Sequence, residues 1–428
     1  MKQNNKIEKT NLQIGESFRQ ENFGKLYSSS ITNEFGNAEC YINSKFLIRP
    51  EYVEREVGNK GIITWGVDNL YPQQLIDICY NVPEQQAIVT KISSLVAGQG
   101  LYIPTNISSG LKKFLSNEAG ESNINKIVKK ISWDTCVFGG FALEVQWASN
   151  GIGAINHISL QNLRIALPKE DRPDGFMYSD NWSKVNKHKP IFIPAYDPKL
   201  DKKEYPNQIY FAKYNDMGIQ NYCLPIYYGA LNEILLAWEI SNFHLSGIRN
   251  GIYGNVIFTF FEVPEQEQRR EHYEKINEQY GGTSSANKCM VFYVSDPTLK
   301  PEITVLDPVK NDEKYLGISE QITQKILTGW GLVNPEIIGI PSPQGISSSS
   351  DDIIFATYRL QNEVINPLQS FIEENLTELA KQNGVYESIT INKIYTDEKI
   401  ANLMSDFGTK TSTIQTEEET QQDKNNTL

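Results

Sequence analysis

One helical pattern constrains this chain more than any other feature of its sequence. It starts at Asp351-Asp352, which can cap a helix, and runs to about Gln382. At about 1.5 Å per residue it would span on the order of 48 Å. Pro367 stands in its middle, where a proline removes one backbone hydrogen bond and should kink the helix. Residues 339–350, rich in Gly, Pro and Ser, predict a loop directly before this long, kinked helix.

The first half of the chain is predicted to be helical and then β-rich. Apolar periodicity indicates helices on both sides of Pro83, ending near Gly98, and another helix over residues 121–135. Residues 138–147 and 154–160 then alternate like the arms of a β-hairpin. Further strand-like segments lie at 163–167, 175–178, 190–194 and 208–213.

The second half places a small αβ unit between two helices, which cover about 226–250 and 311–329. Between them we expect strands at 255–261, 288–294 and 303–306 and a polar helix over 264–280. The apolar stripes of the two helices contain the residues expected to pack, namely Leu231, Ile234, Leu235, Trp238, Leu245, Ile318 and Ile322. Such stripes can face the chain's own core, a neighbouring subunit, or both.

Both ends of the chain are polar. Residues 1–45 are weakly patterned and suggest an arm that gains order only against a neighbour. After Gly384 we expect one strand-like segment over 388–395 and a short helix near 397–404. Residues 406–428 contain almost nothing apolar and are expected to be disordered.

Composition narrows the function classes. Hydrophobic residues make up 39% and charged residues 21%, which allows a packed core, and the net charge of −12 argues against a broad basic surface for gripping nucleic acid. This net charge is still compatible with contact to DNA that slides past the protein. The five cysteines are far apart and suggest buried free thiols, and no apolar run suggests a signal peptide or a membrane span, so we expect a soluble protein made in the cytoplasm.

Catalytic signatures are missing from the sequence. The string nearest to a phosphate-binding loop, residues 282–288, lacks the second glycine and the hydroxyl residue after the lysine. His157, His188, His244 and His272 have no metal-ligand spacing, and the acidic runs at 262–278 and 417–419 are best interpreted as solvated faces. We therefore expect no enzymatic activity, no metal and no cofactor.

Four segments resemble a known family in their order along the chain. They are Tyr228-Gly-Ala-Leu to Arg249-Asn-Gly251, Ile326-Leu-Thr-Gly-Trp-Gly to Gly339, Glu363-Val-Ile-Asn-Pro-Leu-Gln369, and the entry formed by Trp65–Tyr71 and Gly98-Gln-Gly100-Leu. Together they resemble portal proteins of tailed bacteriophages over about residues 60–380. The second segment departs from the family by carrying Trp330 for the aromatic residue and Asn334-Pro335 for paired prolines.

The resemblance implies an α+β portal fold with a wing, a two-helix stem, a small αβ clip, a long kinked tunnel helix and a short crown. The implied boundaries are an arm over 1–45, a wing over 46–225, stem helices over 226–250 and 307–331, a clip over 251–306, a wing and tunnel loop over 332–350, the long helix over 351–383, a crown over 384–405 and an acidic tail over 406–428.

The resemblance also implies a function and partners. A portal is a ring, here of about twelve copies, at the unique capsid vertex of the virion. It is the channel for DNA packaging and ejection, and the docking platform for the terminase large subunit and head–tail adaptors. Major capsid and scaffolding proteins and passing double-stranded DNA would be further partners, with no membrane, and the chain would be made in the host bacterial cytoplasm. The alternatives are another non-enzymatic virion protein, such as a minor capsid or adaptor component, and an enzyme whose site is assembled from scattered residues.

Two sets of residues become candidates through this resemblance. The tunnel-loop candidates are Gln344, Ser347, Ser348, Ser349 and Ser350. The small hydroxyl groups of the four serines could contact DNA without the attraction that cations exert on phosphates. The clip candidates for terminase docking are Glu265, Arg269, Arg270 and Lys275.

Overall fold

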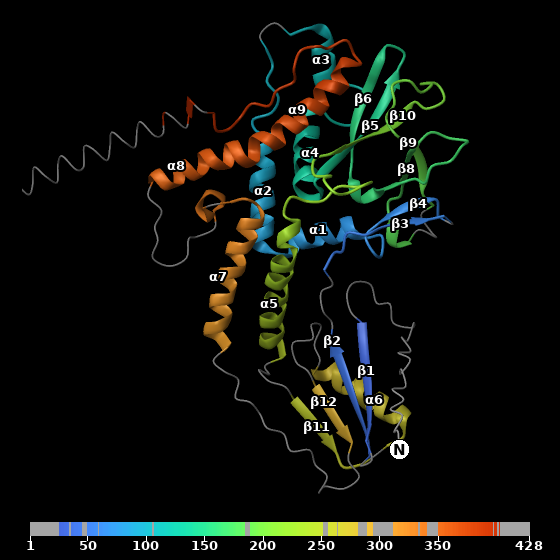
Figure 1. The fold of residues 1–428 in the computed structure, drawn as a ribbon, viewed down its shortest axis with the longest axis vertical. Coiled ribbons are helices and arrows are strands. Elements are labelled where there is room, and N and C mark those ends of the chain that lie inside the picture. The colour runs from blue at the N-terminus through green and yellow to red at the C-terminus, as the bar shows by residue number, and fades with distance from the viewer. Residues whose placement is uncertain are drawn as a thin grey trace, which may run out of the picture. The chain divides into compact units, whose positions relative to one another are not determined.

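The computed structural model describes residues 25–33, 36–44, 49–58, 60–104, 107–184, 189–250, 256–262, 264–280, 289–293, 311–332, 334–339, 350–396, 398–399 and 402 (Figure 1). The chain divides into two compact units. The smaller unit contains residues 1–48 and 239–309, and the larger unit contains residues 49–238 and 310–428.

Four helices form the core of the larger unit. They are α1 (Tyr71–Asn81), α2 (Pro83–Ala97), α4 (Ile124–Phe138) and α9 (Asn366–Lys381), and α2 and α4 each contact the other three. Pro83 starts α2, as predicted, and Gly98 ends it with a φ of 57°. The Gln369 amide on α9 donates to the carbonyls of Leu95 and Val96, 3.1 Å from each. The last carbonyls of α2 are thus satisfied by a helix far away in the sequence.

The β-rich part of the larger unit contains the predicted strands and also one pair, β3 with β4, that was not predicted. The hairpin of β5 (Gly140–Ala148) and β6 (Gly151–Ile158) has β10 (Asn207–Lys213) antiparallel to β5. A second sheet contains β7 (Leu163–Ile165), β8 (Gly175–Tyr178) and β9 (Ile191–Pro194), and β3 (Glu54–Val57) pairs with β4 (Ile62–Trp65). Isolated bridges between Ile62 and Ala166 and between Ala195 and Ile209 link these sheets.

Two asparagine side chains occupy the outer edge of β6. Asn117, at the end of α3 (Ser109–Ser116), accepts from the Ile155 N–H at 2.9 Å and donates to the Ile155 carbonyl at 2.7 Å. Asn383 does the same for Ile152, at 2.6 and 3.1 Å. These amides take the place of a further strand, so they block the edge at which another chain could pair.

The smaller unit contains an αβ part and a hairpin. The strands β11 (Val256–Phe260) and β12 (Cys289–Tyr293) are parallel, and α6 (Gln266–Tyr280) connects them. The strands β1 (Lys25–Asn33) and β2 (Gly36–Ser44) pair along their whole length, and β2 lies beside β12. The prediction of an unpatterned arm over residues 1–45 therefore missed this hairpin, whose neighbour in space is more than 200 residues away in the sequence.

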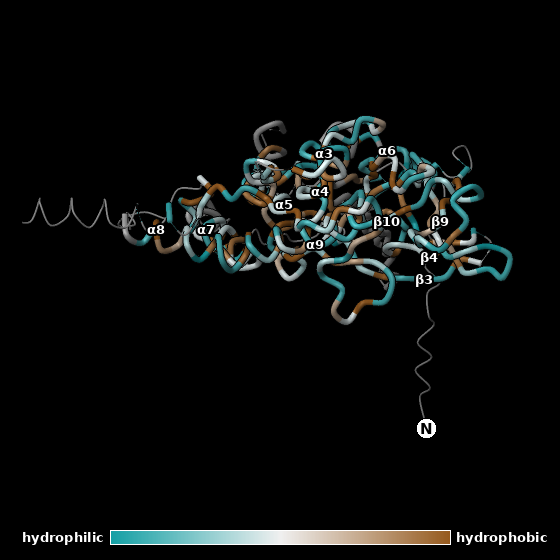
Figure 2. Tube along the Cα trace, turned by 90° about the horizontal axis from the view of Figure 1, so that it is seen from above, coloured by the Kyte–Doolittle hydropathy of each residue, from teal (hydrophilic) through white to brown (hydrophobic). Residues whose placement is uncertain are grey.

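The remaining helices follow the predicted order. They are α5 (Leu231–Asn250), preceded by a 3₁₀ turn (Tyr228–Ala230), then α7 (Asn311–Gly329), a 3₁₀ turn (Pro335–Ile338) and α8 (Ser350–Arg359), with short 3₁₀ turns also at Leu160–Asn162 and Trp182–Lys184. In Figure 2, hydrophobic and hydrophilic residues alternate along α8 and α9, as expected for helices that are half buried. No helix in the described ranges is long and apolar enough to cross a membrane.

The predicted strand over 388–395 is reduced to one bridge, between Ile391 and Leu101, with backbone bonds from Tyr102 to Thr390 and from Asn392 to Gly100. This segment fails to become a strand because only a few residues of the chain run beside it. Of the predicted helix over 397–404, residues 398, 399 and 402 are helical, and the expected strand at 303–306 and the tail from 406 lie outside the described residues.

Candidate assembly and docking surfaces

The helix α5 is apolar on two opposite sides. Leu231 and Leu235 are buried, at 0% and 8% exposure, and Trp238 is half-buried. Each residue of a helix is rotated by about 100° from the one before it, so Leu236 points away from the side that carries Leu231 and Leu235. Leu236 is 46% exposed. Leu245, in the part of α5 that belongs to the smaller unit, was expected on the packed stripe but is also 46% exposed. One side of α5 thus packs within the larger unit and the other presents apolar surface.

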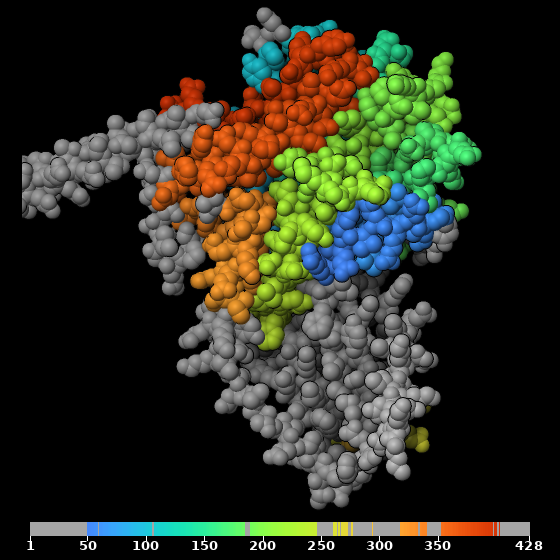
Figure 3. All heavy atoms as spheres, in the orientation of Figure 1, coloured from blue at the N-terminus to red at the C-terminus, as the bar shows by residue number. Residues whose placement is uncertain are grey.

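The helix α7 packs beside the 3₁₀ turn that precedes α5, and α7 and α5 lie side by side in Figure 3. Ile322 and Ile326 are buried, while Ile318, nearer the start of α7, is 39% exposed. Lys325 lies 3.6 Å from Glu233 of α5. Of the seven residues expected to pack, the structure therefore buries Leu231, Ile234, Leu235 and Ile322, half-buries Trp238, and leaves Leu245 and Ile318 exposed.

A buried polar chain joins the end of α7 to the helical core. The Trp330 indole donates to Gln85 at 2.9 Å and stacks on Tyr227, with 4.9 Å between ring centroids. The Tyr227 hydroxyl donates to the Val137 carbonyl at 3.0 Å and lies 3.6 Å from Cys79. All of these side chains are buried. The position at which the sequence departs from the portal pattern, Trp330, is therefore fixed by a partner on α2.

The clip candidates differ in their surroundings. Glu265, Arg270 and Lys275 are exposed, and Lys275 pairs with Glu271 at 2.7 Å. Arg269 is half-buried, donates to the Pro264 carbonyl at 2.7 Å and lies 6.0 Å from the Tyr293 ring. Arg269 thus holds α6 against β12, and the outward part of the predicted docking face consists of the other three residues.

The tunnel-loop candidates fall mostly outside the described residues. This holds for Gln344 and for Ser347, Ser348 and Ser349, whereas Ser350 is the first residue of α8. Pro367 is the second residue of α9, directly after a π-helical turn over Leu360–Ile365. The helix predicted as one element over 351–382 is thus two α-helices joined by a wider turn.

His157 and His272 each contact side chains from neighbouring elements. His157 lies 2.8 Å from Asp134. Burial raises the pKa of Asp134, and the hydrogen bond to the imidazole reduces this shift. His272 stacks on Phe260, and His188 lies outside the described residues. In the described ranges no group of three or more His, Cys, Asp or Glu side chains could hold a metal ion. Cys79, Cys136 and Cys223 are buried free thiols, as predicted.

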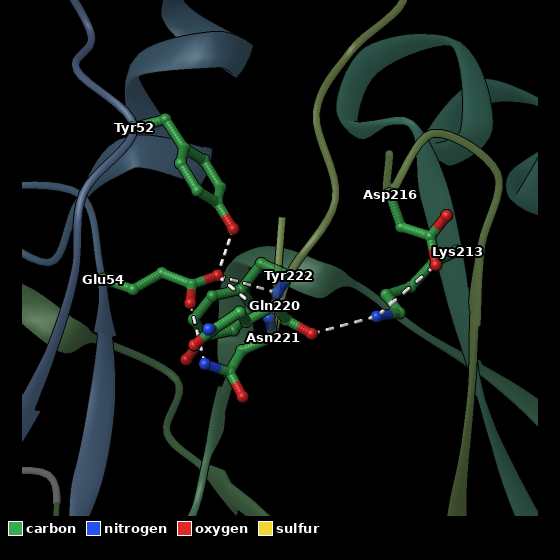
Figure 4. A network of polar contacts seen from close by, with 7 residues as sticks. All are labelled: Tyr52, Glu54, Lys213, Asp216, Gln220, Asn221 and Tyr222. Atoms are coloured by element: carbon green, nitrogen blue, oxygen red, sulfur yellow. Dashed lines mark hydrogen bonds and ion pairs between the residues drawn. The ribbon is translucent and has the colours of Figure 1, made fainter. Parts of the chain in front are cut away.

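Sequence reasoning missed a polar network that holds the segment leading to α5 (Figure 4). The Glu54 carboxylate accepts from the Tyr52 hydroxyl, from the Tyr222 N–H at 3.0 Å, and from the N–H and side chain of Asn221 at 3.2 and 2.7 Å. Burial by itself raises the pKa of Glu54, but these donors outweigh it and bring the pKa below its usual value. No local sequence pattern indicates this network, because Glu54 and Asn221 are about 167 residues apart.

A second missed group is Arg164, which is fully buried. Its guanidinium donates to the side chain and carbonyl of Asn69, at 2.6 and 2.5 Å, and stands 4.9 Å from the Trp182 ring. Burial lowers the pKa of Arg164 to about 10. Since Asn69 has a φ of 64°, the arginine fixes a turn that this residue would adopt only at some cost.

Comparison with known proteins gives matches among solved structures. No protein-family model matches the sequence, and no curated protein matches it. The chain is similar to a structure from the virion of a native gene transfer agent particle, with 13% identity and a TM-score of 0.48 over 78% of this chain and 87% of that chain. It is also similar to one from the neck of a native gene transfer agent particle computed with C12 symmetry, with 15% identity and a TM-score of 0.47 over 76% and 86%.

A third match is the crystal structure of an HK97 family phage portal protein from Corynebacterium diphtheriae, with 12% identity and a TM-score of 0.42 over 78% and 96% of the two chains. A phage portal protein, the class that the ordered sequence segments resemble, is therefore among the matched structures.

Proposed function

We propose that this chain is a portal protein, the subunit of a ring at the unique vertex of a phage capsid. The observation that carries the proposal is the order of elements: α5, the β11–α6–β12 unit, α7, and then the long broken helix α8–α9. The segments that resemble portal proteins fall in the sequence at the corresponding places: at α5, at the end of α7 and across the break between α8 and α9.

The surfaces of α5 support ring assembly. A subunit of a closed ring contacts its two neighbours through two different faces. With Leu231 and Leu235 packed inward, the exposed Leu236 on the opposite side of α5 and the exposed Ile318 on α7 are available to such neighbours. A heterologous contact needs two different faces that fit each other, and Leu236 and Ile318 are the residues that we assign to such faces.

The charge of the chain supports the passage of DNA. A channel lined with lysine and arginine would hold phosphates and slow movement, whereas a chain of net charge −12 limits such attraction. Gln344 and Ser347 to Ser350 would line the channel, and the serines would contact the DNA with small hydroxyl groups. Terminase and head–tail adaptors would dock at Glu265, just before α6, and at Arg270 and Lys275 on the exposed side of α6.

Electron microscopy of the purified chain, negatively stained, tests the proposal together with native mass spectrometry. We expect rings with a central hole, alone or after co-expression with the scaffolding protein. Leu236→Asp should abolish rings, while Met217→Asp, at a position that is 91% exposed, should leave them intact. Folded monomers under both conditions would refute the ring.

The docking face is tested separately on assembled rings. Arg270→Glu should weaken binding of the terminase large subunit and leave the rings unchanged. The matched control is Arg55→Glu, an exposed arginine on β3. Equal binding by both variants would place the docking face elsewhere.

A further inference from the structure

The long helix changes its geometry where α8 meets α9. In the π turn over Leu360–Ile365, the N–H of Asn366 donates to the carbonyl of Gln361, five residues earlier. Such a turn holds one residue more than an α-helical turn. Pro367 follows at once, and in a regular helix its ring would press on the carbonyl four residues before it. The π turn avoids this clash.

Side-chain amides bridge the same turn. Asn362 donates to the Tyr358 carbonyl at 3.1 Å, Asn366 donates to Asn362 at 2.8 Å, and Gln361 donates to Asn366 at 2.7 Å. The Arg359 guanidinium also makes two bonds of 2.8 Å to Glu363. Together with Pro367, these contacts stabilise the wider turn.

The wider turn leaves the aromatic residues of α8 outside. Phe355 is 56% exposed and Tyr358 is 43% exposed, whereas Ile354 and Ala356 are buried at 6% and 5%. The buried side of α8 packs toward the 3₁₀ turn at Pro335–Ile338. Large aromatic groups thus face water while an alanine beside them is covered, which is the reverse of what hydrophobic burial favours.

A shift of α8 by one residue explains why the aromatic residues are exposed and the alanine is buried. Because the π turn adds one residue, α8 is rotated by about 100° from the regular continuation of α9. In a regular helix each α8 residue would occupy the place of the residue before it. Phe355 would then take the buried place of Ile354, and Tyr358 that of Thr357. The places now held by Phe355 and Tyr358 would pass to Ala356 and Arg359.

We propose that α8 has two registers and that the π turn switches between them. In the register described here, Pro367 and the amide bridge hold the turn and Phe355 and Tyr358 point outward. In the other, the turn closes, α8 rotates about its axis by one residue, and both aromatic side chains pack on the larger unit. The switch changes the surface of α8 while α9 stays in place, and it does not depend on ring formation.

Cysteine reactivity in the full-length chain tests the two registers. Phe355→Cys and Ala356→Cys are introduced separately, and their rates with a soluble thiol reagent are corrected for the wild-type rate. In the described register position 355 should react at least about tenfold faster than position 356, because only the former is open to solvent. Deletion of Asn362 removes the extra residue without moving α8, so it holds α8 in the described register and should lower the rate at position 356 below that of the undeleted chain.

The control is Ser370→Cys, at an exposed position on α9 whose reactivity should not change. Pro367→Ala removes the ring that favours the π turn, so it should raise the rate at position 356 at least about threefold. If this variant keeps the circular dichroism spectrum of a folded chain and the rate at position 356 is unchanged, the two-register inference is wrong. If it does not fold, the Asn362 deletion decides: an unchanged rate at position 356 in a folded deletion variant overturns the inference.

Discussion

Asn117→Gly should destabilise the larger unit by removing the amide that closes the edge of β6. Glycine suits the backbone, since Asn117 has a φ of 47°, so the change isolates the side-chain bonds. Those bonds join the amide to the N–H and carbonyl of Ile155, at 2.9 and 2.7 Å, and to the Ser122 carbonyl at 2.7 Å. Both Asn117 and Ile155 are buried, at 6% and 2% exposure.

The magnitude follows from the groups left without partners. An unsatisfied buried donor or acceptor costs about 1–3 kcal/mol, so the two backbone groups of Ile155 together give about 2–6 kcal/mol. Water that enters the space of the lost side chain reduces this, and we expect about 2–4 kcal/mol. Against a total stability of about 5–15 kcal/mol this is a large loss.

Hydrogen–deuterium exchange and thermal unfolding measure the effect. The Ile155 amide should exchange at least about tenfold faster, and the melting temperature should fall by several degrees. Asn123→Gly is the matched control, because Asn123 makes a single exposed bond to the Lys126 N–H at 3.0 Å and should cost only about a few tenths of a kcal/mol. Equal melting temperatures for the two variants, with unchanged exchange at Ile155, would refute the reasoning.

Two further predictions concern pH and close packing. Because the donors around Glu54 bring its pKa below the value of about 4.3 of an unfolded chain, its stabilisation is present above that pH and is lost as the pH falls through the folded-state pKa. The melting-temperature difference between wild type and Glu54→Gln should thus be constant near neutral pH and shrink in acid; a difference that grows in acid, or matches that of the exposed control Glu56→Gln, would contradict this. Gly329→Ala should cost about 1–3 kcal/mol in urea unfolding, because a Cβ there would lie 2.4 Å from the Cβ of Ala230, where α7 and the start of α5 meet. Gly317→Ala, with open space in the same helix, should instead stabilise by about 0.5–1 kcal/mol, and the same sign for both would count against a close contact at position 329.

The elements that the sequence predicts well are those whose signals are local. The hairpin over 138–160, the helix after Pro83 and the stripe from Leu231 to Leu235 all show their period within one stretch of chain. The order of elements from α5 to α9 could be predicted for the same reason. The candidate surfaces were harder, because exposure depends on what covers a residue. Leu245 and Ile318 belong to apolar stripes but stay open.

The sequence by itself determined which segments are helices and strands and in which order they follow. The tertiary structure decided how distant groups complete one another. The asparagines at 117 and 383 close one strand edge, Glu54 binds a segment about 167 residues away, and the hairpin over 25–44 lies beside β12. It also decided the register of the long helix, where Pro367 predicts a disturbance but only the packed turn shows a π turn rather than a simple kink. The physical reason is that local periodicity fixes backbone conformation, whereas burial and the satisfaction of polar groups depend on residues that meet only in the folded chain.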